Sequence, residues 1–221
     1  MSTIPFSQAL RDRGTRPVSG VGASGPGASE RFMSDLLTGR RTRDDYIAMV
    51  AQNFFVYGAL ERAAEARRSD PVAAMFMSPA LTRLPAIRED LRFLLGEGWQ
   101  SEIAPMPTTL RYVDRIERVA AVSTGGFVAH HYTRYLGDLS GCAIIRSIMQ
   151  RQFGFDTNGI GFYVFADIAK PKEFKSTYRR QLDNVGWSAN EQQLVIDEAQ
   201  TAHDLTESLF AELDGRAVRA A

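Results

Sequence analysis

The feature that most constrains the fold is a pair of glycines, Gly137 and Gly141, inside a segment predicted to be one long helix from residue 126 to about residue 153. Each interior glycine costs a helix roughly 1 kcal/mol relative to alanine. Two of them on one helical face therefore indicate a specific requirement. One interpretation is that a flat ligand approaches the backbone, with Asp138 beside the contact. The other is a close crossing of two helices, which is the commoner cause of small residues at this spacing.

Aromatic and basic residues near the two glycines favour the ligand. Tyr132, Arg134 and Tyr135 precede them in the same predicted helix. Arg134 and Asp138 are four residues apart and can meet on the helix surface, where the simpler interpretation is a solvated ion pair. A purely structural helical protein would leave this cluster unexplained.

The composition indicates one soluble globular domain. The 221 residues include 44% hydrophobic and 24% charged residues, enough for a substantial core. A formal net charge of zero argues against a protein that coats nucleic acid. The single cysteine, Cys142, excludes an intramolecular disulfide and fits a reducing compartment. The sequence has neither an apolar run long enough to span a membrane nor an apolar signal core, so we expect a cytoplasmic protein.

Apolar residues recur at three- to four-residue spacing along most of the chain, which predicts an all-α fold of about seven or eight helices. Two patterns mark helix starts: Thr42 with Asp45, and the capping box Ser188-Ala-Asn-Glu191. The capping box opens a final helix that is predicted to run to Gly215. The best strand candidate is the short aromatic run 160–165.

Four segments divide the chain. Residues 1–12 are predicted to contain a short N-terminal helix. Residues 13–29 are rich in glycine, proline and serine, a composition typical of a flexible segment. Residues 30–215 form the predicted helical domain, and residues 216–221 form a C-terminal tail.

Common catalytic motifs are missing from the sequence. It has no phosphate-binding loop, paired-cysteine metal signature or nucleophile elbow. The three histidines are His130, His131 and His203. Neighbouring side chains on a helix point about 100° apart, so His130 and His131 are poor joint ligands for one metal. We expect them to be a partly exposed pair.

The segment Tyr132-Thr-Arg-Tyr-Leu-Gly-Asp-Leu-Ser-Gly141 resembles the distal-helix motif of the biliverdin-producing heme oxygenases of bacterial type. The motif is long and specific, and the resemblance covers nearly the whole chain from Arg31. It implies a single all-helical domain that holds heme between a proximal and a distal helix. Supporting segments are Phe32-Met-Ser-Asp-Leu-Leu37, Tyr57-Gly-Ala-Leu-Glu61, Phe174-Lys-Ser-Thr-Tyr-Arg179, Glu198-Ala-Gln-Thr-Ala202 and Leu209-Phe-Ala-Glu-Leu213.

The resemblance implies roles for the distal residues. Gly137 and Gly141 would let the distal helix approach the heme face. Asp138 would hold a water network that delivers protons during oxygen activation, and a carboxylate suits this role because it orders water without ligating the iron. Arg134 and Tyr57 match other positions of the network.

The resemblance also implies contacts with the heme propionates, which need cations and hydroxyls. Tyr132, Lys175 and Arg179 match these positions, and Arg11 is a looser match. Lys175 and Arg179 lie four residues apart on one helical face, for which the simpler interpretation is a solvated surface.

The family's proximal histidine, which ligates the iron, has no counterpart in this sequence. Its position falls near Ser24, in the Gly/Pro/Ser-rich segment, and no histidine precedes His130. Three explanations stay open: a true loss of the ligand, a corrupted segment, or a different iron ligand. His203 is the candidate ligand, because it lies on the last helix where the family has an apolar residue near the proximal side of the heme. Its simpler interpretation is a core or surface histidine.

Two further positions depart from the family pattern. Cys142 stands where the family usually has another glycine, and a thiol there could crowd the heme or bind its iron. Thr206 stands where the family often has an asparagine in the water network, and its hydroxyl can still hold water.

The resemblance implies cleavage of heme to biliverdin, carbon monoxide and ferrous iron, and so a role in iron release. Heme b would be both cofactor and substrate, with dioxygen as co-substrate. Electrons would come from a separate ferredoxin or flavin reductase, because no flavin or nicotinamide motif is visible. The alternative is a catalytically impaired or non-catalytic heme- or tetrapyrrole-binding protein on the same fold, which the missing proximal histidine favours.

Overall fold

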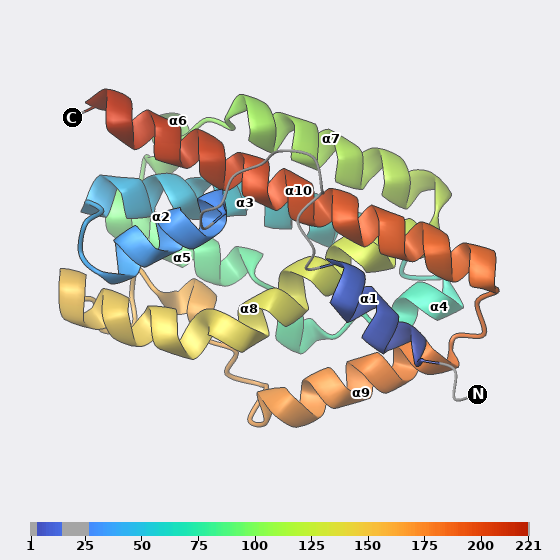
Figure 1. Ribbon diagram of the computed structural model, residues 1–221. Helices are drawn as coiled ribbons and strands as arrows, with labels where there is room; N and C mark the ends of the chain where they lie inside the picture. The colour runs from blue at the N-terminus through green and yellow to red at the C-terminus, as the bar shows by residue number, and fades with distance from the viewer. Residues whose placement is uncertain (1–3, 15–26, 221) are drawn as a thin grey trace.

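The computed structural model describes residues 4–14 and 27–220, and these two ranges form helices joined by short connections (Figure 1). None of their residues forms a strand, which confirms the predicted all-α fold. No helix among them has the length and apolar character needed to cross a membrane. The elements are α1 (Phe6–Gly14), α2 (Ala28–Leu37), α3 (Arg43–Ala66), α4 (Pro71–Ala74), η1 (Pro79–Leu81), α5 (Leu84–Leu95), α6 (Trp99–Glu102), α7 (Pro107–Val122), α8 (Thr124–Phe153), η2 (Gly161–Tyr163), α9 (Pro171–Asn184) and α10 (Ala189–Ala220).

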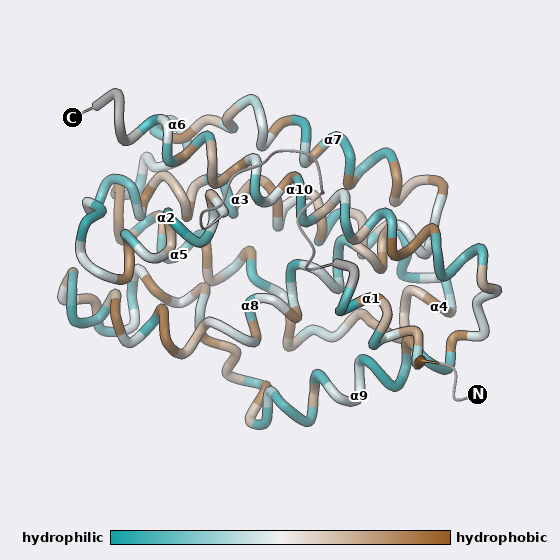
Figure 2. The backbone as a smooth tube through the Cα atoms, viewed as in Figure 1, coloured by the Kyte–Doolittle hydropathy of each residue, from teal (hydrophilic) through white to brown (hydrophobic). Residues whose placement is uncertain are grey.

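Helix α10 organises the packing. It crosses the molecule diagonally and contacts α8, α2, α1 and α7 (Figure 1). Helix α3 packs against α7 and α5, and α9 packs against α1 and α8. Hydrophobic and hydrophilic stretches alternate along α7 and α10 in Figure 2, as expected for helices with one apolar face.

Both predicted helix starts are confirmed. The Thr42 hydroxyl accepts a hydrogen bond from the Asp45 N–H at 3.2 Å, and the Asp45 carboxylate accepts one from the Thr42 N–H at 2.9 Å. Ser188 and Glu191 make the same reciprocal pair at 3.3 and 2.8 Å. These bonds satisfy backbone donors that the first helical turn leaves without partners.

The predicted end of the last helix is wrong. Helix α10 continues through Gly215 to Ala220, so most of the predicted tail is helical. A single interior glycine costs only about 1 kcal/mol, and no proline follows it to stop the helix.

The segment predicted to be flexible, residues 13–29, is helical at both ends. Helix α1 includes Arg13 and Gly14, and α2 begins at Ala28. Residues 15–26, which include Ser24, lie outside the described residues.

The strand candidate 160–165 is wrong, because this segment forms the 3₁₀ helix η2. Its first two N–H groups, on Gly161 and Phe162, donate to the buried carboxylate of Asp90 at 2.8 Å each. Burial raises the pKa of Asp90 to about 6. The Asp90 side chain, from α5, therefore accepts backbone hydrogen bonds that a neighbouring strand would accept if this segment were a strand.

The expectation of a partly exposed histidine pair is also wrong. His130 and His131 are both buried, and each has its own partner. His130 Nε2 lies 2.8 Å from Glu198 of α10, and His131 Nδ1 lies 3.0 Å from the Tyr178 hydroxyl of α9. Burial would raise the pKa of Glu198, but hydrogen bonds from His130 and Arg115 outweigh it and hold the pKa at about 2. The two histidines thus join α8 to different neighbours.

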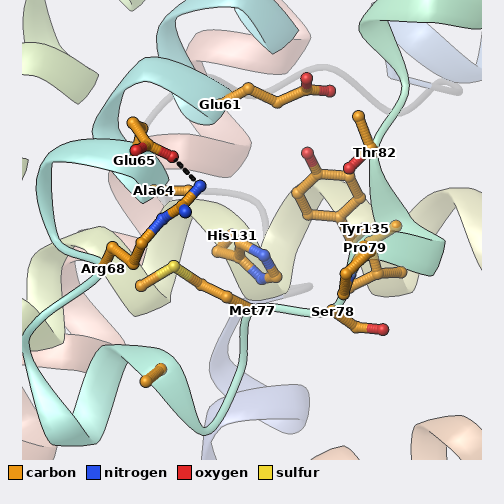
Figure 3. Close-up of a pocket in the computed structure, with 12 residues that line it drawn as sticks. Glu61, Ala64, Glu65, Arg68, Met77, Ser78, Pro79, Thr82, His131 and Tyr135 are labelled. Atoms are coloured by element: carbon orange, nitrogen blue, oxygen red, sulfur yellow. Dashed lines mark hydrogen bonds and ion pairs between the residues drawn. The ribbon is translucent and has the colours of Figure 1, made fainter.

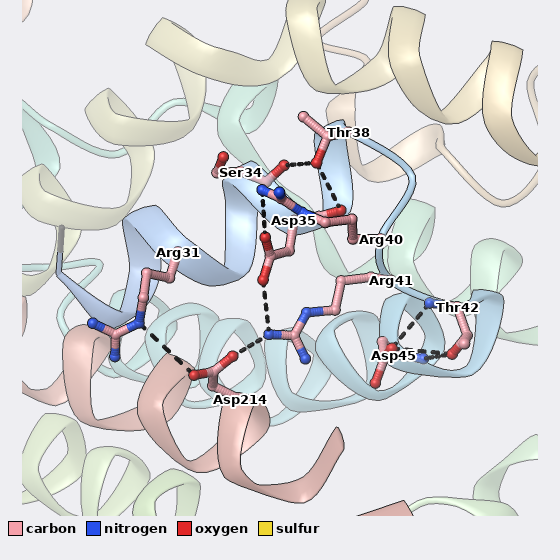
Figure 4. Close-up of polar contacts among 9 residues, drawn as sticks. All are labelled: Arg31, Ser34, Asp35, Thr38, Arg40, Arg41, Thr42, Asp45 and Asp214. Atoms are coloured by element: carbon pink, nitrogen blue, oxygen red, sulfur yellow. Dashed lines mark hydrogen bonds and ion pairs between the residues drawn. The ribbon is translucent and has the colours of Figure 1, made fainter. Parts of the chain in front are cut away.

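An ion-pair cluster fixes α2 against α10 (Figure 4). The nearly buried guanidinium of Arg41, just after α2, pairs with Asp214 of α10 and lies 3.5 Å from Asp35 of α2. Arg31 of α2 approaches the same Asp214 at 3.9 Å. Burial of a paired charge makes the loss of one partner costly, so this cluster specifies how the two helices meet.

We expect Gly126→Ala to destabilise the protein by about 1–3 kcal/mol, because overpacking of a close helix contact costs that much. A Cβ added at Gly126 would lie 2.4 Å from Val119 Cγ2 on α7. Urea unfolding measures the effect, and Gly215→Ala is the control, since its Cβ would meet no described atom within 4 Å. Equal stability of both variants would contradict this description of the α7–α8 crossing.

Candidate functional site

A cavity of about 340 Å³ lies between α2, α3, α8, η2 and α10, and we call it the α8–α10 cavity. Five of the predicted site residues line it: Arg134, Gly137, Asp138, His203 and Thr206. The other lining residues are Ser29, Met33, Met49, Asn53, Thr133, Ile145, Phe162, Tyr163, Glu207 and Phe210.

Gly137 faces open space. A Cβ built on it would meet no described atom within 4 Å, and one built on Gly141 would meet only Ile145 Cδ1 at 3.8 Å. The interpretation of these glycines as a helix crossing is therefore wrong for the described part of the chain. The close helix contact lies near the start of α8, where Gly126 packs against Val119 of α7. Gly137 instead leaves room beside the α8 backbone, where a planar molecule can approach.

Asp138 is held by Tyr57. The buried Tyr57 hydroxyl, on α3, donates a hydrogen bond to Asp138 Oδ2. Desolvation raises the pKa of Asp138 well above its ordinary value. The carboxyl group thus has a fixed position beside the cavity and binds a proton more tightly than a solvated carboxyl group does.

Arg134 does not pair with Asp138. No ion pair among the described residues joins them, and Arg134 is buried, so the simpler interpretation of a solvated ion pair is wrong. Its Nη2 donates to Asn53 Oδ1 at 2.9 Å, and its Cζ lies 5.1 Å from the centre of the Tyr57 ring. Its buried Nε has no hydrogen-bond partner among the described residues. Arg134 therefore supports Tyr57, which in turn holds Asp138.

Asn53 was not identified from the sequence. It lies on α3 one helical turn before Tyr57, so the two residues share a face of that helix. An asparagine on an apolar helical face is unusual, because its side chain competes for backbone hydrogen bonds. A polar residue on this apolar face, one turn before Tyr57, is therefore the sequence signal that could have identified Asn53 as a site residue.

Helix α10 contributes a row of side chains to the same cavity. His203, Thr206, Glu207 and Phe210 all line it, at the spacing of one helical face. The Thr206 hydroxyl donates to the Ala202 carbonyl at 2.9 Å. Glu207 accepts a hydrogen bond from the Ser29 N–H of α2 at 3.2 Å, which connects two walls of the cavity.

The predicted propionate contacts lie outside the residues that line the cavity. Lys175 Nζ donates to Ser140 Oγ at 2.9 Å, so it reaches α8 next to Gly141. Burial, Arg179 and Lys172 lower its pKa. Burial raises the pKa of Tyr132, and the neighbouring Arg179 opposes this rise. The structure thus brings Tyr132 and Arg179 together, with Lys175 one turn away on α9.

Cys142 faces the core and does not line the α8–α10 cavity. Burial raises its thiol pKa, and the neighbouring Asp138 adds to this effect. A thiol that keeps its proton and does not line the cavity is poorly suited to bind a metal there.

A second cavity, of about 540 Å³, lies between α3, α8 and the η1 region. Figure 3 shows His131 and Tyr135 facing it, with Glu61 and an ion pair of Glu65 with Arg68 around them. Burial lowers the pKa of His131 to about 3, so this imidazole is neutral at physiological pH. Although it is larger, this cavity contains neither Gly137 nor Asp138, and the chemistry predicted from the sequence belongs to the α8–α10 cavity.

We expect Asp138→Asn to stabilise the protein at neutral pH. Folding raises the pKa of Asp138, so the folded state holds this proton at pH values where the unfolded chain has released it. The free energy of unfolding therefore falls as pH rises from the usual carboxyl pKa towards the pKa of the folded protein. Asparagine can still accept from Tyr57 and has no such loss. The Tm difference between variant and wild type should be smallest near the usual carboxyl pKa and should grow as pH rises towards 7. Parallel Tm–pH curves would contradict a raised pKa.

Comparisons with known proteins agree on one family. A family model described as heme oxygenase matches residues 28–212. Heme oxygenase 1 of Synechocystis sp. is 34% identical over 189 residues, which cover 86% of this chain and 79% of that protein. Human heme oxygenase 1 is 37% identical over 185 residues, which cover 82% of this chain and 64% of that protein.

Solved structures give the same result. Heme oxygenase-1 from Synechocystis sp., in complex with heme, matches with a TM-score of 0.86 and 30% identity over 98% of this chain and 96% of that chain. Heme oxygenase from Leptospira interrogans matches with a TM-score of 0.83 and 26% identity over 95% of this chain and all of that chain. These matches confirm the predicted fold and favour heme degradation over the non-catalytic alternative. The chain belongs to the heme oxygenase family.

Proposed function

We propose that this heme oxygenase binds heme b in the α8–α10 cavity and cleaves it to biliverdin, carbon monoxide and ferrous iron. Dioxygen is the co-substrate, and a separate ferredoxin or flavin reductase supplies electrons. The observation that carries this proposal is the open space at Gly137 next to the Tyr57–Asp138 hydrogen bond. The single cysteine fits a reducing compartment, and we propose the cytoplasm as its location.

The residues of the cavity fit a heme. Apolar side chains form much of its lining, which suits a flat hydrophobic ring. Gly137 leaves the α8 backbone accessible, and the partnerless Nε of Arg134 leaves a donor available at the same wall. The apolar side chains are Met33, Met49, Ile145, Phe162 and Phe210.

When bound, heme supplies the iron that activates dioxygen and the ring that is cleaved. The protein must then deliver protons without a strong acid next to the oxygen. Asp138 fits this requirement, because its raised pKa makes it a weak acid and Tyr57 fixes its orientation. Arg134, which donates to Asn53, positions Tyr57 by packing against its ring, and the Thr206 hydroxyl is placed to bind water on the α10 side.

Heme also carries two propionates, and we propose that Tyr132, Arg179 and Lys175 bind them. Support comes from the grouping of Tyr132 with Arg179 at the α8–α9 contact. Lys175 can turn from Ser140 to an anion, because its side chain is long and only partly buried. Arg11 of α1 adds positive charge near Tyr132.

A hemin titration followed by absorbance tests this function, with ascorbate or a reductase then added in air. We expect a one-to-one Soret band that gives way to a biliverdin spectrum. Stoichiometric hemin binding without biliverdin would support the non-catalytic alternative, which the absence of any histidine before His130 favours. No stoichiometric binding would exclude both functions.

A further inference from the structure

The cavity holds one of the three histidines of the chain. His130 and His131 are buried and bonded to Glu198 and Tyr178, and neither lines the α8–α10 cavity. His203 is partly buried and lines it. Among the described residues, no hydrogen bond or ion pair occupies the His203 ring. An imidazole that lines a cavity and has no partner is available to a ligand.

The position of His203 is fixed by helix geometry. Its neighbours at three, four and seven residues along α10, namely Thr206, Glu207 and Phe210, line the same cavity. These spacings define one face of a helix, so His203 belongs to the face that α10 turns towards the cavity. Gly137 and Asp138 line it from α8. Gly137 and the His203 imidazole therefore lie on two different walls of the α8–α10 cavity.

The other side chains that can ligate heme iron are less suitable. Proteins use histidine, cysteine, methionine or tyrosine for this purpose. Cys142 does not line the cavity, and Met49 is 2% exposed in the core. Tyr163 is buried, and burial raises its pKa, which opposes the phenolate needed for iron binding. Met33 of α2 is the remaining donor beside His203.

The two carboxylates of the cavity already have partners. Asp138 accepts from Tyr57, and Glu207 accepts from Ser29. Glu207 lies one helical turn after His203 on the same face. A carboxylate so placed can accept the second ring N–H of a ligating histidine, an arrangement that usually accompanies such ligands.

We propose that His203 ligates the heme iron from α10, in place of the histidine that the family pattern would put near Ser24. This inference rests on heme binding in the α8–α10 cavity and assigns the iron a ligand from the last helix. Heme would then lie between α8 and α10, and α2 would contribute a wall without an iron ligand.

The test compares hemin-loaded wild type with His203→Ala and Met33→Leu. Ferrous nitric oxide complexes are measured by electron paramagnetic resonance, because an axial nitrogen ligand adds its own hyperfine splitting. We expect that splitting in wild type and Met33→Leu and its loss in His203→Ala. Hemin affinity should fall at least about tenfold in His203→Ala, which is about 1.4 kcal/mol. Added imidazole should restore the splitting by occupying the vacated space.

Circular dichroism and Tm of the unloaded variants show whether each is folded. The imidazole rescue gives a second readout, since a misfolded variant would not regain the signal. Unchanged splitting in His203→Ala, or no axial nitrogen splitting in wild type, would overturn the proposal while leaving heme binding intact. Hemin that fails to bind wild type would overturn both the proposal and the function on which it rests.

Discussion

Replacing Asp138 by alanine is expected to lower the biliverdin yield about a hundredfold while hemin still binds. General acid–base groups contribute about 10²–10⁴-fold to rates, and Asp138 is the carboxyl group at the open wall of the cavity. Without it, protons arrive through disordered water. The reaction should turn to unproductive oxidation, visible as peroxidase-like activity towards a phenol. Single-turnover absorbance and product chromatography measure both outcomes.

Two variants serve as matched controls for Asp138→Ala. Tyr57→Phe removes the donor that holds Asp138 but keeps the carboxyl group, so it should lower the yield by a smaller factor. Thr201→Ala lies on α10 and does not line the cavity, so it should behave as wild type. An unchanged biliverdin yield in Asp138→Ala would remove this residue from the mechanism.

Replacing Gly137 by leucine is expected to weaken hemin binding at least about a hundredfold, which is about 2.7 kcal/mol. The leucine side chain would occupy space at the α8 wall of a cavity of about 340 Å³. The unloaded protein should be at least as stable as wild type, because a Cβ at Gly137 meets no described atom within 4 Å and leucine favours a helix by up to about 1 kcal/mol. Hemin titration and Tm measure the two effects.

Gly126→Ala is the converse of Gly137→Leu. It should lower stability and leave hemin affinity unchanged, because its added methyl meets Val119 of α7 and lies outside the cavity. Wild-type hemin affinity in Gly137→Leu would show that heme does not lie against this part of α8.

Local signals in the sequence were sufficient for much of the fold. These signals act over a few residues. The capping pairs at Thr42 and Ser188 begin helices as predicted, and Gly137 and Gly141 leave open space along α8. The 160–165 segment was misassigned because its backbone partner, Asp90, is distant in sequence. No local pattern carries that information.

The partners of the site residues were harder to predict for the same reason. The spacing of Arg134 and Asp138 on α8 allows the two side chains to meet, but Asn53 of α3 offers Arg134 a buried acceptor that this spacing does not reveal. His130 and His131 are buried because α10 and α9 supply Glu198 and Tyr178. Side chains from α3, α9 and α10 thus decide which polar groups of α8 have hydrogen-bond partners. Among the histidines of the described structure, only His203 has no such partner.

The ion-pair cluster between α2 and α10 has a consequence for how the protein is made. Helix α2 leaves the ribosome early, but Arg41 and Ser29 depend on Asp214 and Glu207 near the end of the chain. Since chains begin to fold from the N-terminus during synthesis, α2 must wait for its partner helix. The cavity wall that α2 forms is therefore completed last. Heme capture then requires α10 to have been made, and a chain truncated before α10 would not retain heme.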